Sequence, residues 1–518
     1  MSTRPIRFFF RGQIHEVRDL PPTTSVLRWL RESADACGTK EGCAEGDCGA
    51  CTVLVGELDA QERLQLRNIN ACIQFLPMLD GKALFTVEDL GSSRQLNPVQ
   101  QALVDCHGSQ CGFCTPGFAM SLQAIYEAHQ AAGTRPSRQQ LADGLAGNLC
   151  RCTGYRPILD AGEQMFDGPA QCLDRAPAEA ALRLLRQDPP LAYEAHDPAR
   201  QAPRQFHAPR SLDELAALYL QHPDARLLAG ATDIGLWVNK QHRDVGTLIS
   251  TLGVEALKQL RAEPWPDGQP ALWIGAAVPL EDAWAALVEQ LPTLRELWLR
   301  FASPPVRHAG TLGGNIANGS PIGDGAPALI ALGATIVLRC GSAQRRLPLQ
   351  DFYLDYMKNA LQPGEFVEAL HVPLPAMGWL LRGYKIAKRY DSDISAVCAV
   401  FALRVDQGQV LDARLVYGGM AGIVRRATHA EAALLGRAWD EQAVHAAAAA
   451  LTQDFQPLSD LRASAAYRMQ VAQNLLRRCW LETRDDRPLP AAQSSVWWAV
   501  QLHPDGPPPQ SQAAGVQP

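Results

Sequence analysis

Residues 37–53 read CGTKEGCAEGDCGACTV, and this stretch decides the fold of the first part of the chain. Three of its cysteines follow the spacing C-x4-C-x2-C, and a fourth lies further along the chain. The four are Cys43, Cys48, Cys51 and Cys72. Glycine and alanine crowd the same stretch, so the backbone can curl tightly and point N–H groups at anionic sulfur. The pattern predicts a loop wrapped around a metal centre.

The spacing of this first quartet is typical of a plant-type 2Fe-2S site, in which three thiolates share a loop and the fourth arrives later. Zinc is the alternative, because four cysteines also satisfy a tetrahedral zinc ion. Structural zinc sites usually pair two CxxC-like knuckles, however, and this quartet does not. The residues therefore favour a 2Fe-2S cluster over zinc or disulfides.

A second quartet combines a CxxC pair with a CxC pair and consists of Cys111, Cys114, Cys150 and Cys152. The CxxC pair opens the stretch 117–130, GFAMSLQAIYEAHQ, whose apolar residues recur at helical spacing. The CxC pair ends a second helical stretch, 141–150. Thiolates near helix termini gain from the helix dipole and from free N–H groups. The residues alone leave 2Fe-2S and zinc both open here, because CxxC and CxC are ordinary zinc knuckles.

Length and charge restrict the class of protein. A chain of 518 residues exceeds what one hydrophobic core usually holds, so roughly three or four domains are expected. The net charge is −6 and the isoelectric point is near 6.1, and no basic block indicates a nucleic-acid or membrane surface. The N-terminal apolar run, 8–10, is short, and no stretch reaches transmembrane length. We therefore expect a cytoplasmic protein that acts on small molecules.

Two glycine-rich segments in the second half are candidates for binding a pyrophosphate. The first, 225–240, turns through glycine and threonine, and the second, 306–334, joins glycines to threonine and asparagine. Free backbone N–H groups with short polar donors suit a pyrophosphate, although a turn-rich loop could serve chain reversal alone. The run Gly323–Ala328 fits G-x-G-x-x-A, but no buried strand directly precedes it, so we reject a Rossmann fold.

Three motifs resemble the iron–sulfur portion of the molybdenum hydroxylases, the family that includes xanthine dehydrogenase and aldehyde oxidase. They are EGCAEGDCGACTV at 41–53, QCGFCTPGF at 110–118 and GNLCRCTGYRPI at 147–158. The resemblance implies that the second quartet also holds a 2Fe-2S cluster. Asp47 stands where the family often has glycine, and its charge would tend to lower the potential of the first cluster without removing a ligand.

The expected fold class is α+β multidomain. The resemblance implies a plant-ferredoxin-like β-grasp domain (1–85), an all-α four-helix-bundle 2Fe-2S domain (86–167), a linker (168–200), an α+β FAD-binding domain of the vanillyl-alcohol oxidase and CO dehydrogenase flavoprotein type (201–378), a CO dehydrogenase flavoprotein-like α+β C-terminal domain (379–495) and a disordered tail (496–518). Residues 5–18 alternate around Arg11-Gly12 as a hairpin would, and 24–33 read as a capped helix. The linker is proline-rich and lacks a clear strand pattern.

The same resemblance implies FAD contacts residue by residue. Leu227 to Ile234 looks like the loop that wraps the FAD pyrophosphate, and Thr311 to Asn315 looks like its partner loop. Asp324 matches an acidic residue near the ribose or phosphates, and Lys385 looks like a flavin-contacting lysine. The implied set is Leu227, Leu228, Ala229, Gly230, Ala231, Thr232, Asp233, Ile234, Phe301 (an aromatic packed by the flavin or adenine), Thr311, Leu312, Gly313, Gly314, Asn315, Asn318, Asp324, Val367 (an aliphatic contact) and Lys385.

The resemblance also implies a function and its partners. The chain ends soon after the flavin region, whereas single-chain relatives continue into a molybdopterin-binding portion, so we expect the smaller subunit of a split enzyme. Gln110 lies beside the pterin in relatives, which directs the second quartet toward molybdenum and the first toward FAD. We expect a dimer of heterodimers with a large molybdopterin-binding subunit.

Electron flow to NAD is expected because a mixed-charge loop with Lys388, Arg389, Asp391 and Asp393 lies where NAD approaches in the family. A solvated surface loop is the alternative, and oxygen stays open as an acceptor. Oxidation of hypoxanthine and xanthine is the leading expectation for the complex. The alternatives are an aldehyde or N-heterocycle hydroxylase, or a redox-sensing protein without catalysis.

Overall fold

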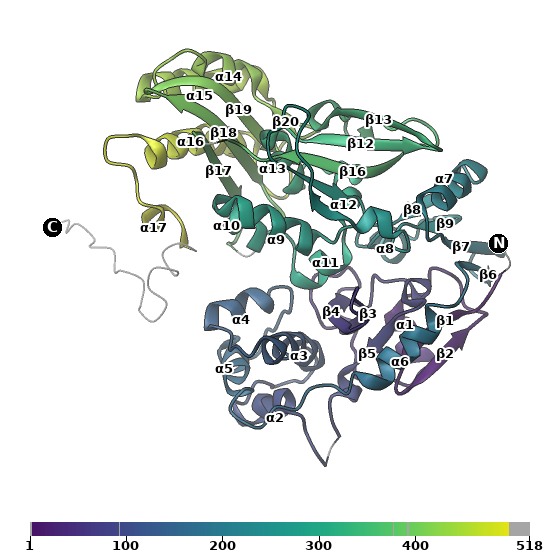
Figure 1. Ribbon diagram of the computed structural model, residues 1–518. Helices are drawn as coiled ribbons and strands as arrows, with labels where there is room; N and C mark the ends of the chain where they lie inside the picture. Colours follow the sequence, from purple (N-terminus) through teal and green to yellow (C-terminus); the bar gives the residue numbers. More distant parts are fainter. Residues whose placement is uncertain (1–2, 93, 377, 391–392, 497–518) are drawn as a thin grey trace.

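The computed structural model describes residues 3–92, 94–376, 378–390 and 393–496 (Figure 1). The first domain is a five-stranded sheet in the order β2-β1-β5-β3-β4. Its strands are β1 (Ile6–Phe10), β2 (Gln13–Val17), β3 (Thr52–Leu58), β4 (Leu64–Asn70) and β5 (Ala83–Phe85), with helix α1 (Val26–Glu32) and 3-10 helices η1 (Leu76–Leu79) and η2 (Val87–Asp89). The predicted hairpin and capped helix are confirmed, because β1 pairs antiparallel with β2 and Ser25 caps α1.

Four helices form the second domain, in the lower part of Figure 1. They are α2 (Pro98–Asp105), α3 (Thr115–Ala132), α4 (Arg138–Gly144) and α5 (Arg156–Gln164). Their core is continuous with one face of the first sheet, where Phe118 and Leu122 pack with Leu54 and Phe85. The two cysteine-bearing domains therefore share one hydrophobic core and form a single unit.

The interval 168–200 contains regular structure, which corrects the expectation of a linker without strands. Helix α6 (Ala176–Leu185) packs on the first sheet, and strand β6 (Leu191–Asp197) pairs antiparallel with β7 (Ala202–Ala208). The prolines that flank β6 obscured the alternation of apolar and polar residues along this short strand. Its pairing with β7 stabilises it, and the local sequence does not reveal that pairing.

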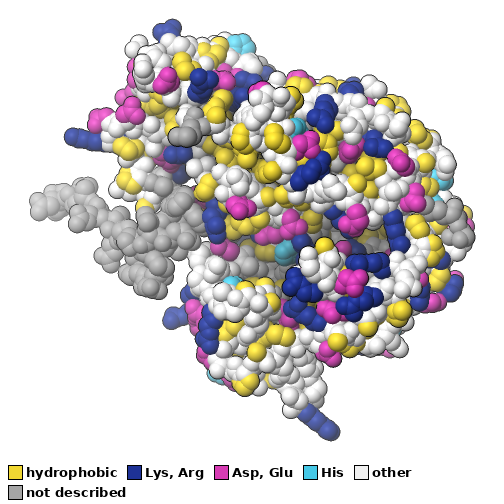
Figure 2. Space-filling view, viewed as in Figure 1, with side chains coloured by type: hydrophobic (Ala, Val, Ile, Leu, Met, Phe, Trp, Pro, Cys, Tyr) yellow, Lys and Arg dark blue, Asp and Glu magenta, His cyan; other side chains and the backbone are white. Residues whose placement is uncertain are grey.

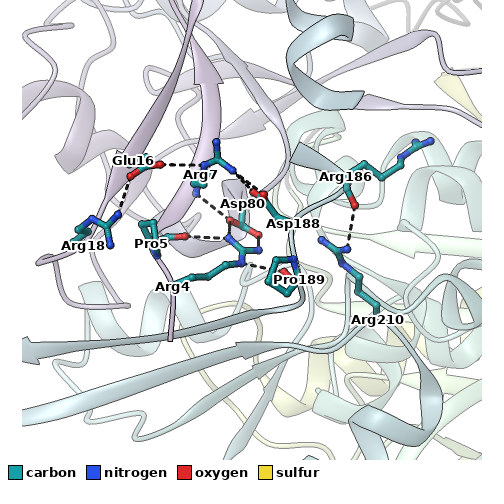
Figure 3. Close-up of polar contacts among 10 residues, drawn as sticks. All are labelled: Arg4, Pro5, Arg7, Glu16, Arg18, Asp80, Arg186, Asp188, Pro189 and Arg210. Carbon is teal, nitrogen blue, oxygen red and sulfur yellow. Dashed lines mark hydrogen bonds and ion pairs between the residues drawn. The ribbon is translucent and has the colours of Figure 1, made fainter. Parts of the chain in front are cut away.

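The end of this interval is anchored to β1 by ion pairs (Figure 3). Arg4 binds Asp80 through two hydrogen bonds of 2.8 and 2.6 Å and donates to the carbonyl of Pro189 at 3.0 Å. Arg7 binds both carboxylate oxygens of Asp188 at 2.7 Å. Paired, forked contacts of this kind give a defined geometry, so the connection between the two halves is held in place.

The next region has two larger sheets and a two-stranded one, in which β14 pairs with β15. The smaller, β6-β7-β9-β8, includes β8 (Arg226–Leu228) and β9 (Leu248–Ser250), and the larger runs β10-β11-β16-β12-β13. The larger sheet consists of β10 (Leu260–Ala262), β11 (Ala271–Gly275), β16 (Phe366–Pro373), β12 (Thr335–Cys340) and β13 (Ala343–Pro348). The remaining elements are α7 (Leu212–Gln221), α8 (Ile234–Asn239), η3 (Glu255–Lys258), α9 (Leu280–Gln290), η4 (Pro292–Leu294), α10 (Arg295–Leu299), α11 (Pro304–Ala309), α12 (Leu312–Asn318), α13 (Gly325–Leu332), η5 (Leu349–Asp351), β14 (Tyr353–Asp355) and β15 (Lys358–Asn359).

The last domain packs helices on a four-stranded sheet at the top of Figure 1. Its elements are β17 (Trp379–Ile386), β18 (Val397–Asp406), β19 (Gln409–Gly418), β20 (Arg425–Arg426), α14 (Thr428–Leu434), α15 (Glu441–Asp454), α16 (Ala465–Thr483) and α17 (Ala491–Ser494). Helix α13 is buried along its whole length against this sheet and the larger FAD-region sheet, so it joins the two domains. The predicted tail, 496–518, lies outside the described residues except for Val496.

No helix in the described ranges is both long enough and apolar enough to cross a membrane.

Candidate iron-sulfur and FAD sites

The structure brings the first quartet together on the loop between α1 and β3 and at the end of β4. The sulfur of Cys43 lies within hydrogen-bonding distance of the Cys48 and Cys72 thiols, and Cys72 also contacts Cys51. Cys51 and Cys72 are each 2% exposed. The backbone N–H groups of Glu45 and Cys48 donate to Cys43 Sγ at 3.4 Å. Such donors stabilise negative charge on sulfur.

Glycines make this close wrapping possible. A Cβ on Gly42 would lie 2.8 Å from Cys48 Sγ, and a Cβ on Gly46 would lie 2.6 Å from a methyl carbon of Ile73. Gly46 and Gly49 also have positive φ angles of 81° and 68°. A larger residue at these positions would therefore push the loop away from its thiols.

Three thiols of the first quartet, Cys43, Cys48 and Cys72, affect one another's ionisation. Hydrogen bonds from Cys48 and Cys72 hold the pKa of Cys43 well below its usual range. The same hydrogen bonds, together with burial, raise the pKa of Cys48 and of Cys72. Of these three thiols, Cys43 is therefore the first to become a thiolate, the form that ligates a metal.

The second quartet forms two pairs. Cys114, the N-cap residue of α3, contacts Cys150, and Cys111 contacts Cys152, so the loop before α3 faces the loop between α4 and α5. Burial, followed by the Cys150 contact, raises the pKa of Cys114 to about 12. Burial also opposes ionisation of Cys150, but hydrogen bonds led by that of Thr153 lower the pKa of Cys150 overall. Cys111 and Cys152 are exposed.

The donor set of each quartet fits a two-iron cluster. The first quartet is joined through Cys43 and Cys72, and the second stands as two facing pairs. A 2Fe-2S cluster takes four cysteines as two on each iron, so both arrangements offer the ligands that it needs. In the part of the chain that the structure describes, no three His, Cys, Asp or Glu side chains are arranged to hold one metal ion.

The two predicted FAD loops meet. The loop after β8 carries Gly230, where a Cβ would lie 1.9 Å from the carbonyl oxygen of Ala309. A Cβ on Gly310 would lie 3.3 Å from Thr232 Oγ1, and Thr311 Oγ1 accepts from the Gly314 N–H at 3.1 Å. Among the described residues, the backbone N–H groups of 230–232 donate to no backbone carbonyl. Free donors between packed glycines fit a bound pyrophosphate.

The remaining members of these loops flank that contact. Leu227 and Leu228 end β8, Ala229 and Ala231 lie on either side of Gly230, and Asp233 precedes α8 at Ile234. On the other side Leu312, Gly313 and Asn315 lie in the first turns of α12 and Asn318 ends it. A Cβ on Gly313 would lie 2.4 Å from the Cβ of Ala276, so α12 presses closely on the larger sheet.

Lys385 and Asp324 form a buried ion pair. Both are nearly inaccessible, at 4% and 2% exposed, and Lys385 Nζ donates to the Asp324 carboxylate and to the carbonyl of Asp393. Ser395 Oγ donates to the other Asp324 oxygen at 2.6 Å. Sequence reasoning missed Ser395, since only the fold of β17 and β18 brings it to Asp324.

Phe301 and Val367 lie in the core of the FAD region. Phe301 is 6% exposed and packs against Trp284 with ring centroids 5.8 Å apart, and Val367 in β16 is 8% exposed. Arg300, which sequence reasoning also missed, donates to the carbonyls of Lys385 and Tyr390 at 3.0 Å. It thereby holds β17 and the start of the loop that follows it. Asp391 lies outside the described residues.

The first quartet adjoins the FAD loops directly. Gln74 Nε2 donates to the Gly230 carbonyl at 2.7 Å, and Asn239 Nδ2 donates to the Cys72 carbonyl at 2.7 Å. A Cβ on Gly235 would lie 2.7 Å from the carbonyl oxygen of Ile73. The segment that carries Cys72 is therefore in contact with the loop predicted to wrap the pyrophosphate. No sequence signal marked Gln74 or Asn239.

A separate cavity of about 860 Å³ lies between the first sheet, α6 and the FAD region (Figure 2). Its charged side chains already form pairs, including Arg67 with Asp282 at 2.8 Å and Lys82 with Glu57 at 2.7 Å. Thr311 is the predicted FAD residue that lines it among the residues that the structure describes. The cavity therefore lies beside the predicted FAD site and shares Thr311 with it.

Four family models match successive parts of the chain. They are the 2Fe-2S iron-sulfur cluster binding domain over 8–76, the [2Fe-2S] binding domain over 86–163, the FAD binding domain in molybdopterin dehydrogenase over 201–375 and the CO dehydrogenase flavoprotein C-terminal domain over 382–483. These matches confirm the predicted fold class. They define a chain with two 2Fe-2S cluster binding domains and an FAD-binding domain.

The chain is similar to xanthine dehydrogenases and aldehyde oxidases over most of its length. Similar proteins include xanthine dehydrogenase of Drosophila subobscura, 31% identical over 93% of this chain and 39% of the relative. Aldehyde oxidase 4 of Cavia porcellus is 31% identical over 84% of this chain and 36% of the relative. The chain therefore spans less than half the length of these relatives. A solved structure of carbon monoxide dehydrogenase from Hydrogenophaga pseudoflava is 31% identical, with a TM-score of 0.49, over 53% of this chain and 94% of its own.

Proposed function

We propose that this chain is the electron-transfer subunit of a xanthine dehydrogenase, working with a large molybdopterin-binding subunit. When bound, 2Fe-2S clusters carry single electrons, and FAD accepts two and delivers them as a hydride to NAD. The observation that carries the proposal is the adjacency of the three predicted sites. Cys72 lies in the segment that contacts the Gly230 loop, and Cys48 accepts a hydrogen bond from the residue before Cys150.

The side chains around the second quartet support a partner on that side. Cys111 and Cys152 are exposed, and so is Gln110. Phe113 and Leu149 beside them are 47% and 49% exposed. Exposed apolar groups around a functional site are typical of a protein–protein interface. The first quartet, in contrast, faces the FAD loops of its own chain.

The loop after β17 supports NAD as the acceptor. Arg300 holds the carbonyls of Lys385 and Tyr390, and between these two residues Lys388 and Arg389 are exposed cations that could attract phosphates. Purine oxidation is the leading activity because relatives named xanthine dehydrogenase cover most of this chain. An aldehyde is the second candidate substrate, because the aldehyde oxidase relative is as similar.

Analysis of the purified complex tests this proposal. The chain should contain about four irons and one FAD, and a large molybdenum-containing subunit should copurify with it. Xanthine should then reduce NAD in a molybdenum-dependent reaction. NADH formation from an aldehyde but not from xanthine would replace the purine assignment, and oxygen consumption without NADH would replace NAD. A solitary chain with clusters and FAD but no partner would favour redox sensing.

A further inference from the structure

The two quartets are joined by a backbone hydrogen bond. The N–H of Leu149 donates to the carbonyl oxygen of Cys48 at 3.0 Å. Cys48 belongs to the first quartet, and Leu149 directly precedes Cys150 of the second. A path through bonds from one quartet to the other therefore crosses one hydrogen bond and no empty space.

Glycines allow the two loops to approach this closely. A Cβ on Gly49 would lie 2.3 Å from the carbonyl oxygen of Gly147, and a Cβ on Gly117 would lie 2.1 Å from the carbonyl oxygen of Gly49. A Cβ on Gly147 would lie 2.2 Å from Ser303 of the FAD region. Three domains therefore meet at this contact: the two cysteine loops pack backbone against backbone, and the FAD region adds the side chain of Ser303.

Asn148 holds the contact from the side. It is 3% exposed, and its Nδ2 donates to the Gly49 carbonyl at 3.1 Å and to Thr52 Oγ1 at 3.2 Å. Its Oδ1 accepts from Ser121 Oγ at 2.6 Å. The amide of Asn148 is thus hydrogen-bonded to the loop of the first quartet, and the backbone of Asn148 continues into Leu149 and Cys150 of the second. Buried polar groups that are fully paired in this way give a site one defined geometry.

A chain of buried hydrogen bonds extends from Asn148 to the FAD region. Asn68 Nδ2 donates to Ser121 Oγ at 3.2 Å, and His308 Nδ1 lies 2.7 Å from Asn68 Oδ1. The Asn68 oxygen can only accept, so His308 Nδ1 carries the proton. His308 lies in α11, immediately before the Ala309 and Gly310 backbone that packs on Gly230. We name this set (His308, Asn68, Ser121, Asn148 and Thr52) the interdomain polar chain.

We propose that Asn148 is the positioning residue that sets the separation of the two quartets, and that the Leu149–Cys48 hydrogen bond is the electron-transfer contact between them. This inference rests on the proposed electron-transfer function. With clusters held by the two quartets, one electron would pass from the cluster on the second quartet, which would be oxidised, to the cluster on the first, which would be reduced. No bond forms or breaks and no proton moves. Without the Asn148 amide, a cavity separates the loops and the hydrogen bond between them lengthens.

A matched pair of asparagine variants in the full-length, cluster-loaded chain tests the proposal. Asn148→Ala is compared with Asn97→Ala, because Asn97 is an equally buried asparagine of the helical domain, 2% exposed, whose Nδ2 donates to Gln123 at 2.6 Å away from both quartets. Iron and FAD content, the electron paramagnetic resonance spectrum of the reduced protein and the rate of electron redistribution after pulse radiolysis are measured. Magnetic coupling between two reduced clusters splits their spectral lines and falls as they separate.

Asn148→Ala should keep its iron and FAD, lose part of the line splitting and redistribute electrons severalfold more slowly. Asn97→Ala should lower the melting temperature comparably yet keep the wild-type splitting and rate. Wild-type splitting and rate in iron-replete Asn148→Ala would overturn the inference while leaving the electron-transfer function intact. A wild-type chain without two clusters would instead overturn the function.

If Asn148→Ala loses iron, its line splitting no longer reports the separation of two clusters. A second variant then tests the proposal. Ser121→Ala removes the donor to Asn148 Oδ1 but leaves both Asn148 Nδ2 contacts in place. It should therefore keep both clusters and show a smaller loss of splitting. Unchanged splitting in Ser121→Ala would overturn the inference.

Discussion

The two cysteine quartets differ in where their ligands come from and in what surrounds them. The first takes three ligands from one loop, and its Cys51 and Cys72 are buried between the first sheet and the FAD loops. The second takes its ligands from two separate loops, and Cys111 and Cys152 are exposed. A single loop can set the positions of its three thiols by its own conformation. Thiols on two facing loops reach one another only when the helices that carry the loops are packed together. We infer that burial suits the first quartet to exchange within the chain and exposure suits the second to exchange with a partner.

Removing one cysteine from each quartet makes the strongest contrast. Cys72→Ala should lose about two of about four irons and also destabilise the first domain, because the thiol is buried and paired with Cys43 and Cys51. Cys152→Ala should lose as much iron but leave thermal unfolding of the iron-free protein nearly unchanged. Iron analysis and calorimetry measure the two effects, and equal destabilisation of the iron-free variants would contradict the comparison.

Glycine replacements separate crowding from backbone strain in the two cluster loops. Gly49→Ala combines a positive φ of 68° with a clash against the Gly147 carbonyl, and should cost about 2–3 kcal/mol. Gly112→Ala has a positive φ of 83° but nothing within 4 Å of the new methyl group, and should cost about 1 kcal/mol. Denaturant unfolding of both variants gives the difference, and a larger cost at Gly112 would refute the crowding argument.

A surface replacement tests whether the second quartet faces the partner. Phe113→Lys should weaken binding of the molybdenum subunit by about 1–2 kcal/mol without loss of iron. Leu411→Lys is the matched control, because both side chains are 47% exposed and Leu411 lies on the C-terminal domain. Binding is measured by calorimetric titration of the partner, and a larger loss with Leu411→Lys would place the interface elsewhere.

The stability of the protein should depend on pH through His308, the member of the interdomain polar chain that lies in the FAD region. Burial lowers the pKa of His308 to about 4 from an ordinary value of 6.5. The unfolded chain therefore binds the proton more readily, so this histidine contributes stability above pH 6.5 that is lost as the pH falls toward 4. His308→Gln should flatten the stability curve between these values in urea titrations. An unchanged slope would show that other groups dominate.

Much of the site was predictable because its signals are local. Cysteine spacing identified both quartets, and the glycine-rich segments at Gly230 and Gly313 identified loops that do meet in the structure. Strand β6 was missed because flanking prolines obscure its short alternation and its partner strand lies beyond a turn. The ion pair of Lys385 with Asp324 could not be derived either, because two residues far apart in the sequence meet only when the sheet that contains β17 packs beside α13.

The sequence by itself determined which thiols can serve as ligands, since reactive atoms and their spacing along one loop are local properties. Its contiguous motifs also indicated the resemblance to the molybdenum hydroxylases. Only the tertiary structure decided that Cys48 and Leu149, the residue before Cys150, are joined by a hydrogen bond, that Asn148 joins their loops, and that the Cys72 segment touches the Gly230 loop. These contacts connect three domains. Their geometry follows from shared cores and backbone packing, which the spacing of residues along the sequence does not encode.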